Sequence, residues 1–234
     1  MNLFNFKALG LTLVLVVSVI SPAYSAVIIS EVDANGSGAS YGADWFELTN
    51  TGASSLNISG WKMDDNSNSF AAAVALRGIT SIAAGQSVVF LEGNTTGSTD
   101  ATINANFKAA WFGSNVPSNF VIANYGGSGV GLSATTDAVN IFDGAGSLIT
   151  RVDFDASTIG RTFDNKAGLN NVTISTLSSA GVNGAFSSAS AYSTTVSAAE
   201  IGSPGLVAAV PEPETYAMLL AGLSLIGFAA RRRK

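Results

Sequence analysis

The chain has 234 residues, of which 47% are hydrophobic and only 12% are charged. It contains no histidine and no cysteine, which excludes Ser-His-Asp and Cys-His nucleophiles, thiolate metal ligands and disulfides. Residues 26–210 carry six cationic and fourteen acidic side chains, hence a net charge of −8, and their lysines and arginines form no cluster. The sequence therefore predicts no nucleic-acid partner, because such proteins neutralise phosphates with grouped cations.

The first 25 residues have the three parts of a secretory signal peptide. Lys7 supplies the positive charge, an apolar run covers residues 9–20, and the small side chains of Ala23 and Ser25 suit signal peptidase. The apolar run is shorter than the roughly 18 residues that a membrane span needs. We expect signal peptidase to cleave before Ala26, so that the mature chain leaves the cytoplasm.

Short runs of β-branched and aromatic residues dominate the next part of the chain. They cover residues 27–32, 45–48, 56–58, 61–63, 88–91, 139–142 and 148–154. The turn at residues 143–146, Asp-Gly-Ala-Gly, is the strongest hairpin signal, and only residues 70–76 have a pattern compatible with a brief helix. The pattern predicts an antiparallel β-sandwich or barrel with a single core, in which Trp45 and Trp61 are buried.

Three carboxylates in these runs suggest structural roles more than catalysis. We expect Glu47 to bind a turn or Lys62, because no second activated group accompanies it. Asp153 and Asp155 would share one side of a strand with Arg151, which predicts a charge-balanced strand end. An acid pair at these two aspartates is the alternative.

A loop near the start of the body has the ligand spacing of a calcium site. Counted from Asp33, oxygen-bearing side chains stand at positions one, three, five and twelve, and glycine stands at position six. The ligands would be Asp33, Asn35, Ser37 and Asp44. Strands instead of helices would flank this loop, and an ordinary Asn-Gly loop without metal is the alternative. No other cofactor is predicted.

Several of these segments resemble the lamin-tail domain. The similar stretches are Ile-Ser-Glu-Val at 29–32, Asp-Trp-Phe-Glu-Leu-Thr-Asn at 44–50, Leu-Asn-Ile-Ser-Gly-Trp-Lys-Met-Asp at 56–64, Ile-Ala-Ala-Gly-Gln-Ser-Val-Val-Phe at 82–90, Leu132 with Asp-Ala-Val-Asn-Ile-Phe-Asp at 137–143, and Gly-Ser-Pro-Gly at 202–205. The resemblance implies an immunoglobulin-like antiparallel β-sandwich over residues 26–207, in a family whose bacterial members are secreted. Residues 93–133 and 158–197, which are rich in Gly, Ser, Asn and Ala, depart from the family pattern.

Residues 208–234 have the layout of a sorting tail. An apolar segment at 217–230 follows the residues Val210, Pro211, Glu212 and Pro213. After it come the basic residues Arg231, Arg232, Arg233 and Lys234. A helix of fourteen residues reaches about 21 Å, which is short for a hydrocarbon core of about 30 Å, so we expect a transient anchor with its basic end in the cytoplasm. A permanent anchor is the alternative.

This tail resembles the PEP-CTERM sorting signal of Gram-negative bacteria. The resemblance implies that an exosortase recognises Pro211, Glu212 and Pro213 at the inner membrane, removes the tail and releases the body to the cell surface or extracellular matrix.

Together these features predict an exported structural or adhesive protein without enzymatic activity, associated with extracellular polysaccharide. One alternative is a carbohydrate-binding module that uses exposed aromatic residues such as Tyr41, Trp111 or Tyr125. A metal-dependent extracellular hydrolase is the other, and it would have to rely on carboxylates alone.

Overall fold

The computed structural model describes residues 27–36, 40–93, 98–127, 129–206 and 222–224. Within these ranges the chain forms fourteen strands and one helix longer than a single turn. In chain order the elements are β1 (Val27–Asp33), β2 (Trp45–Asn50), β3 (Leu56–Asn57), β4 (Lys62–Asp64), β5 (Val74–Ala75), β6 (Ser81–Ile82), β7 (Ser87–Gly93), α1 (Asp100–Phe112), β8 (Val121–Gly126), β9 (Asp137–Phe142), β10 (Leu148–Phe154), β11 (Phe163–Asp164), β12 (Val172–Ile174), β13 (Phe186–Ala191) and β14 (Ala199–Gly202). All of them belong to one compact unit, Ser25–Val210.

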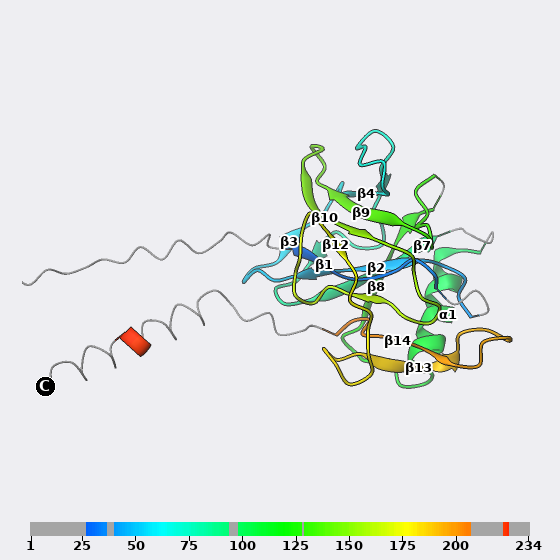
Figure 1. Cartoon of the computed structure of the whole chain (residues 1–234). Coiled ribbons are helices and arrows are strands. Elements are labelled where there is room, and N and C mark those ends of the chain that lie inside the picture. The colour runs from blue at the N-terminus through cyan, green and yellow to red at the C-terminus, as the bar shows by residue number, and fades with distance from the viewer. Residues whose placement is uncertain (1–26, 37–39, 94–97, 128, 207–221, 225–234) are drawn as a thin grey trace, which may run out of the picture. The chain divides into compact units, whose positions relative to one another are not determined.

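Two five-stranded sheets pack face to face and make an all-β sandwich (Figure 1). The first, which we call the inner sheet, has the order β11-β1-β2-β7-β8, and the outer sheet has the order β12-β10-β9-β4-β5. Phe46 and Phe90 of the inner sheet share one buried cluster with Val139 and Phe154 of the outer sheet. This cluster is the main core.

The inner sheet is covered on its other face as well. There Trp45 and Leu91 pack against Phe107 and Trp111 of α1, with Phe186 of β13 beside them. Every residue of β1 and β2 is consequently buried. Strands covered on both faces lose the alternation of apolar and polar residues that marks a half-exposed sheet.

The strands expected from sequence are confirmed as β1, β2, β3, β4, β7, β9 and β10. The hairpin at residues 143–146 joins β9 to β10, closed by the Gly146 N–H that donates to the Asp143 carbonyl. Trp45 is fully buried and Trp61 is 7% exposed, as predicted.

The prediction of purely antiparallel pairing is wrong at two places. β7 pairs with β8, and β10 with β12, in parallel. Parallel neighbours need a long crossover connection, and α1 lies in the crossover from β7 to β8. This helix falls within residues 93–133, for which no helix was predicted.

The brief helix considered at residues 70–76 is also not found. Residues 70–72 form a turn, and β5 follows at Val74–Ala75, where it pairs with β4.

Candidate functional site

Two buried carboxylates face each other across the β1–β2 pair. The register places Glu31 directly opposite Glu47, and both are fully buried on the face of the inner sheet that points away from the main core. Like charges opposite each other destabilise a strand pair, and a buried charge without a partner costs more. The arrangement therefore needs a cation and several hydrogen-bond donors.

Lys166 is that cation, and a bulge in β1 places it. The register of β1 shifts between Ile29 and Glu31, and the Ser30 carbonyl there accepts a hydrogen bond of 2.9 Å from the Asn165 N–H. The next residue, Lys166, brings its Nζ to 2.5 Å from Oε1 of Glu47, with side-chain exposures of 3% and 0%. Although burial opposes its charge, attraction by Glu47 and Glu31 raises the pKa of Lys166 above 10.5.

The same three charged groups hold the turn that follows β14, which we call the closing turn (residues 203–206). The Ser203 N–H donates to Oε1 of Glu31 at 2.7 Å, and the Gly205 N–H donates to Oε2 of Glu47 at 2.5 Å. Lys166 Nζ donates to the Leu206 carbonyl at 2.7 Å. We call Glu31, Glu47 and Lys166 the charge cluster. Its hydrogen bonds hold the closing turn, which contains the last described residues before the tail.

Glycine at position 202 lets the closing turn approach Glu31. A Cβ atom at Gly202 would lie 2.7 Å from Oε1 of that glutamate, too near for any other residue without a shift.

Burial raises the pKa of Glu31 from 4.5 to about 7. Lys166 lowers this pKa and the neighbouring Glu47 raises it, while Thr162 and Ser203 donate hydrogen bonds that favour the charged form. Desolvation is the dominant cause, so Glu31 takes up a proton at a much higher pH than an exposed glutamate.

The loop with calcium-like spacing begins at the buried carboxylate of Asp33 and ends at the half-buried carboxylate of Asp44. Asp33 Oδ1 accepts from the Asn35 N–H at 3.0 Å, and Asp44 Oδ1 accepts from the Gly36 N–H at 3.4 Å. Burial and the nearby Glu200 raise the pKa of Asp33, and burial and Glu92 raise that of Asp44 to about 7.

Ser37, the third ligand expected from sequence, lies outside the described residues. Within the described ranges, no three His, Cys, Asp or Glu side chains are grouped as metal ligands. The calcium site stays a prediction.

Glu47 pairs with Lys166 and with the closing turn, so its expected turn contact is confirmed and Lys62 is the wrong partner. Lys62 instead lies over the ring of Phe70, 4.5 Å from its centroid. The ion pair between Arg151 and Asp153 is confirmed.

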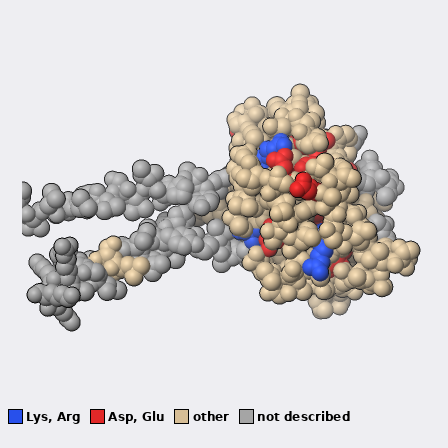
Figure 2. All heavy atoms as spheres, in the orientation of Figure 1, with Lys and Arg blue, Asp and Glu red and all other residues tan. Residues whose placement is uncertain are grey.

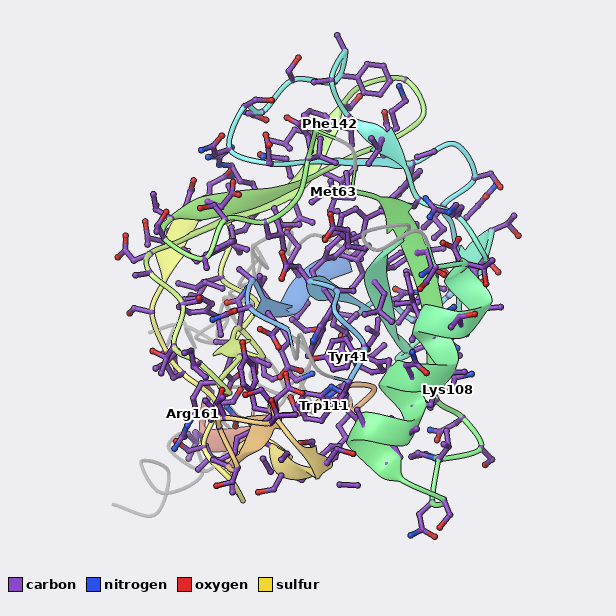
Figure 3. The ribbon with its side chains drawn as sticks, turned by 90° about the vertical axis from the view of Figure 1, so that its right-hand side faces the viewer. Tyr41, Met63, Lys108, Trp111, Phe142 and Arg161 are labelled. Carbon is purple, nitrogen blue, oxygen red and sulfur yellow. The ribbon has the colours of Figure 1, made fainter. Side chains whose placement is uncertain are left out.

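The aromatic residues considered as a sugar-binding platform are not exposed. Tyr41, Trp111 and Tyr125 are 4%, 1% and 0% exposed, and the first two belong to the cluster between α1 and the inner sheet (Figure 3). The large, fully buried rings are core residues, so the expectation that they are exposed is wrong.

Sequence reasoning missed Lys166 and Glu200. Lys166 stands in a stretch without strand periodicity, and its neighbours carry no motif, so nothing in the sequence marks it as buried. Glu200 lies in β14, a strand that was not predicted, where its carboxylate accepts a hydrogen bond of 2.7 Å from Tyr41 Oη.

The sorting residues Val210, Pro211, Glu212, Pro213 and Arg231–Arg233 lie outside the described residues, as does the signal peptide at 1–25. Residues 222–224 are helical. Across the described parts of the chain, no helix has the length and apolar character required to cross a membrane.

The fold and its charge cluster define an all-β sandwich whose closing turn is held by buried ionic groups. Residues 20–156 match the model of the Lamin Tail Domain, and residues 209–234 match that of the PEP-CTERM protein-sorting motif. Since the first match covers more than half of the sequence, the chain belongs to the lamin tail domain family. No curated protein matches the chain. The sorting motif marks the protein for export and exosortase processing.

Proposed function

We propose that this chain is an exported structural or adhesive protein of the cell surface or extracellular matrix, without enzymatic activity. The observation that carries the proposal is the PEP-CTERM motif directly after a lamin tail sandwich. An exosortase would remove the tail at the inner membrane after transient anchoring, and the body would be retained among extracellular polysaccharide.

The charge cluster supports a structural role for the body. Glu31, Glu47 and Lys166 use their hydrogen bonds to hold the closing turn, and all three are buried. Catalytic acids must instead reach a substrate. The face shown in Figure 2 carries few charged side chains, which suits contact with neutral hydrated polymers more than with ionic partners.

Sorting can be tested in the native host by replacing Pro211, Glu212 and Pro213 with alanine. We expect the wild-type protein outside the cell to lack Arg231–Lys234, and the alanine variant to stay in the inner membrane with its tail intact. A matched control replaces Thr194, Thr195 and Val196 in the loop before β14 with alanine. Extracellular protein that still carries its basic end, measured by intact mass, would contradict the proposal.

Matrix retention needs a separate measurement. Labelled body protein added to extracellular polysaccharide from the same host should sediment with it, and an unrelated sandwich of similar charge should not. Turnover of polysaccharides, nucleic acids or phosphoesters by the purified protein would favour the hydrolase instead. Binding on a glycan array that is lost on replacing one exposed residue would favour a carbohydrate-binding module.

A further inference from the structure

The contact between the side chains of Lys166 and Glu47 is buried. Nζ lies 2.5 Å from Oε1, and the two side chains are 3% and 0% exposed. Taking two ions out of water is costly, and their attraction offsets this cost only when the geometry is good and further hydrogen bonds are made. A neutral group in the same place would avoid it.

We propose that Lys166 and Glu47 condense to form an amide bond within the folded chain. Nζ of Lys166 attacks Cδ of Glu47, the Nζ–Cδ bond forms, and the Cδ–Oε1 bond breaks. Oε1 leaves as water with two protons from the original ammonium group, so the ion pair becomes one neutral amide and one water. No oxidant, metal or other reactant is needed, and the proposal does not depend on the proposed function.

The first proton transfer follows the existing contact. The ammonium must lose a proton before its nitrogen can attack, and the carboxylate oxygen that it touches accepts that proton. Because attraction by Glu47 and Glu31 raises the pKa of Lys166, the ammonium is the resting form, and the proton passes to Glu47 only during the reaction.

The neighbouring donors are placed for the steps that follow. The Gly205 N–H donates to Oε2 of Glu47 at 2.5 Å, so it can stabilise negative charge on this oxygen while Cδ is tetrahedral. The Ser30 hydroxyl donates to Oε1, the leaving oxygen, at 2.7 Å. The Leu206 carbonyl accepts from Nζ at 2.7 Å and orients it.

Confinement in the fold accelerates a reaction that is very slow between the same groups in solution. Two groups held in contact react as if at effective concentrations of about 10⁵ to 10⁸ M. Lys166 and Glu47 are 119 residues apart in sequence, and only the folded sandwich brings them together. The reaction should therefore occur in folded protein and not in denatured chains.

The amide would join β2 to the segment after β11 in a protein that has no cysteine for a disulfide. A cross-link over so long a loop restricts the unfolded chain as a disulfide does. It would also fix Lys166, which holds the closing turn just before the sorting tail.

Mass spectrometry of the protein isolated from its exporting host tests the proposal. We expect the folded protein to be lighter than its sequence mass by one water molecule. After tryptic digestion, the peptide with Glu47 should be joined to the peptide with Lys166, and the bond after Lys166 should stay uncut because trypsin does not cleave at an acylated lysine.

Three variants complete the test. Lys62→Arg is the matched control and should lose water as the wild type does, whereas Lys166→Arg should keep its full mass. Glu47→Gln should lose ammonia instead of water and reach the mass of the wild-type product.

Cyclisation at Asp143-Gly144 also releases water, so the mass alone does not decide and the joined peptide must be found. Folded wild-type protein with separate Glu47 and Lys166 peptides would overturn the proposal, even if Lys166→Arg fails to fold.

Discussion

Lys166 has the largest expected effect among the charged residues, because two buried carboxylates depend on it. Glu31 and Glu47 face each other at the same register, and Lys166 contacts Glu47 directly. Hydrogen bonds from Ser203 and Gly205 complete the cluster. The residue therefore connects the β1–β2 pair to the end of the body.

Relative to wild-type protein in which Lys166 and Glu47 are still an ion pair, replacing Lys166 by methionine should lower the free energy of unfolding by about 3 to 5 kcal/mol. The substitution keeps most of the side-chain volume but leaves the carboxylates buried without a cation, which is the costly way to break a buried ion pair. Urea unfolding followed by tryptophan fluorescence measures the change. Lys62→Met is the control and should cost about 1 kcal/mol or less, because it removes only a contact with the Phe70 ring. Equal effects of the two substitutions would contradict the assigned role of Lys166.

Of the two contacts that Glu47 makes, with a turn and with a lysine, only the first could be predicted correctly from the sequence. The residue sits in an aromatic strand, and its contact with a turn was foreseen from the absence of a catalytic partner. The lysine partner was not foreseen, because an ion pair across 119 residues depends on tertiary structure and leaves no local pattern.

α1 is the element that turns a two-layer sandwich into a structure with both faces of the inner sheet covered. Its buried residues, Ile103, Phe107, Ala110 and Trp111, recur at the spacing of one helix face. Thr99 caps the helix by accepting from the Thr102 N–H at 3.3 Å, and Asp100 pairs with Arg77. This face pattern was present in the sequence, but the surrounding Gly, Ser and Asn residues obscured it.

Phe107→Ala should destabilise the protein by about 3 to 5 kcal/mol, as large-to-small substitutions in a core do. The Phe107 ring is fully buried and contacts the rings of Tyr41, Trp45 and Trp111. Lys108→Ala on the neighbouring position is the control and should change stability by about 0.5 kcal/mol or less. Amide hydrogen exchange would then be faster across α1 in the phenylalanine variant. Unchanged exchange and an unchanged urea midpoint would mean that α1 does not depend on this cluster.

The loop from Asp33 to Asp44 gives a prediction about calcium. If the spacing binds the ion, millimolar calcium should raise the melting temperature, because a ligand that binds only the folded state stabilises it. Asp44→Asn should abolish the shift, and Asp155→Asn, which changes an exposed carboxylate, should not. If calorimetry detects no binding heat, and the melting temperature is the same in calcium and in chelator, the site is rejected. The segment is then an ordinary Asn-Gly loop.

The strands were predictable and the layering of the whole molecule was not. Runs such as residues 148–154 alternate because one face of β10 is half-exposed, and this alternation is visible in the sequence. β2 is fully buried because α1 and the closing turn, which come from distant parts of the chain, contact it. Burial of both faces of the inner sheet could therefore not be predicted from its own strands.

At the scale of the whole molecule, much of the acidic charge lies inside. Four carboxylates of β1, β2 and β14 are buried, namely Glu31, Asp33, Glu47 and Glu200. Burial raises the pKa of Glu31 and of Asp44 to about 7, from 4.5 and 3.8 respectively. The folded state therefore binds more protons than the unfolded state between these values.

It follows that the free energy of unfolding should fall as pH rises from about 5 to about 8. The contribution of Glu31 is complete below its unfolded pKa of 4.5 and is lost as pH rises through about 7, which amounts to about 3 kcal/mol at about 1.4 kcal/mol per unit. Asp44 acts in the same direction. Urea midpoints across this range measure the slope, which Glu31→Gln should reduce and Asp155→Asn should leave unchanged. A protein that becomes more stable with rising pH would show that these carboxyls are charged throughout, because groups with lowered pKa values give the opposite slope.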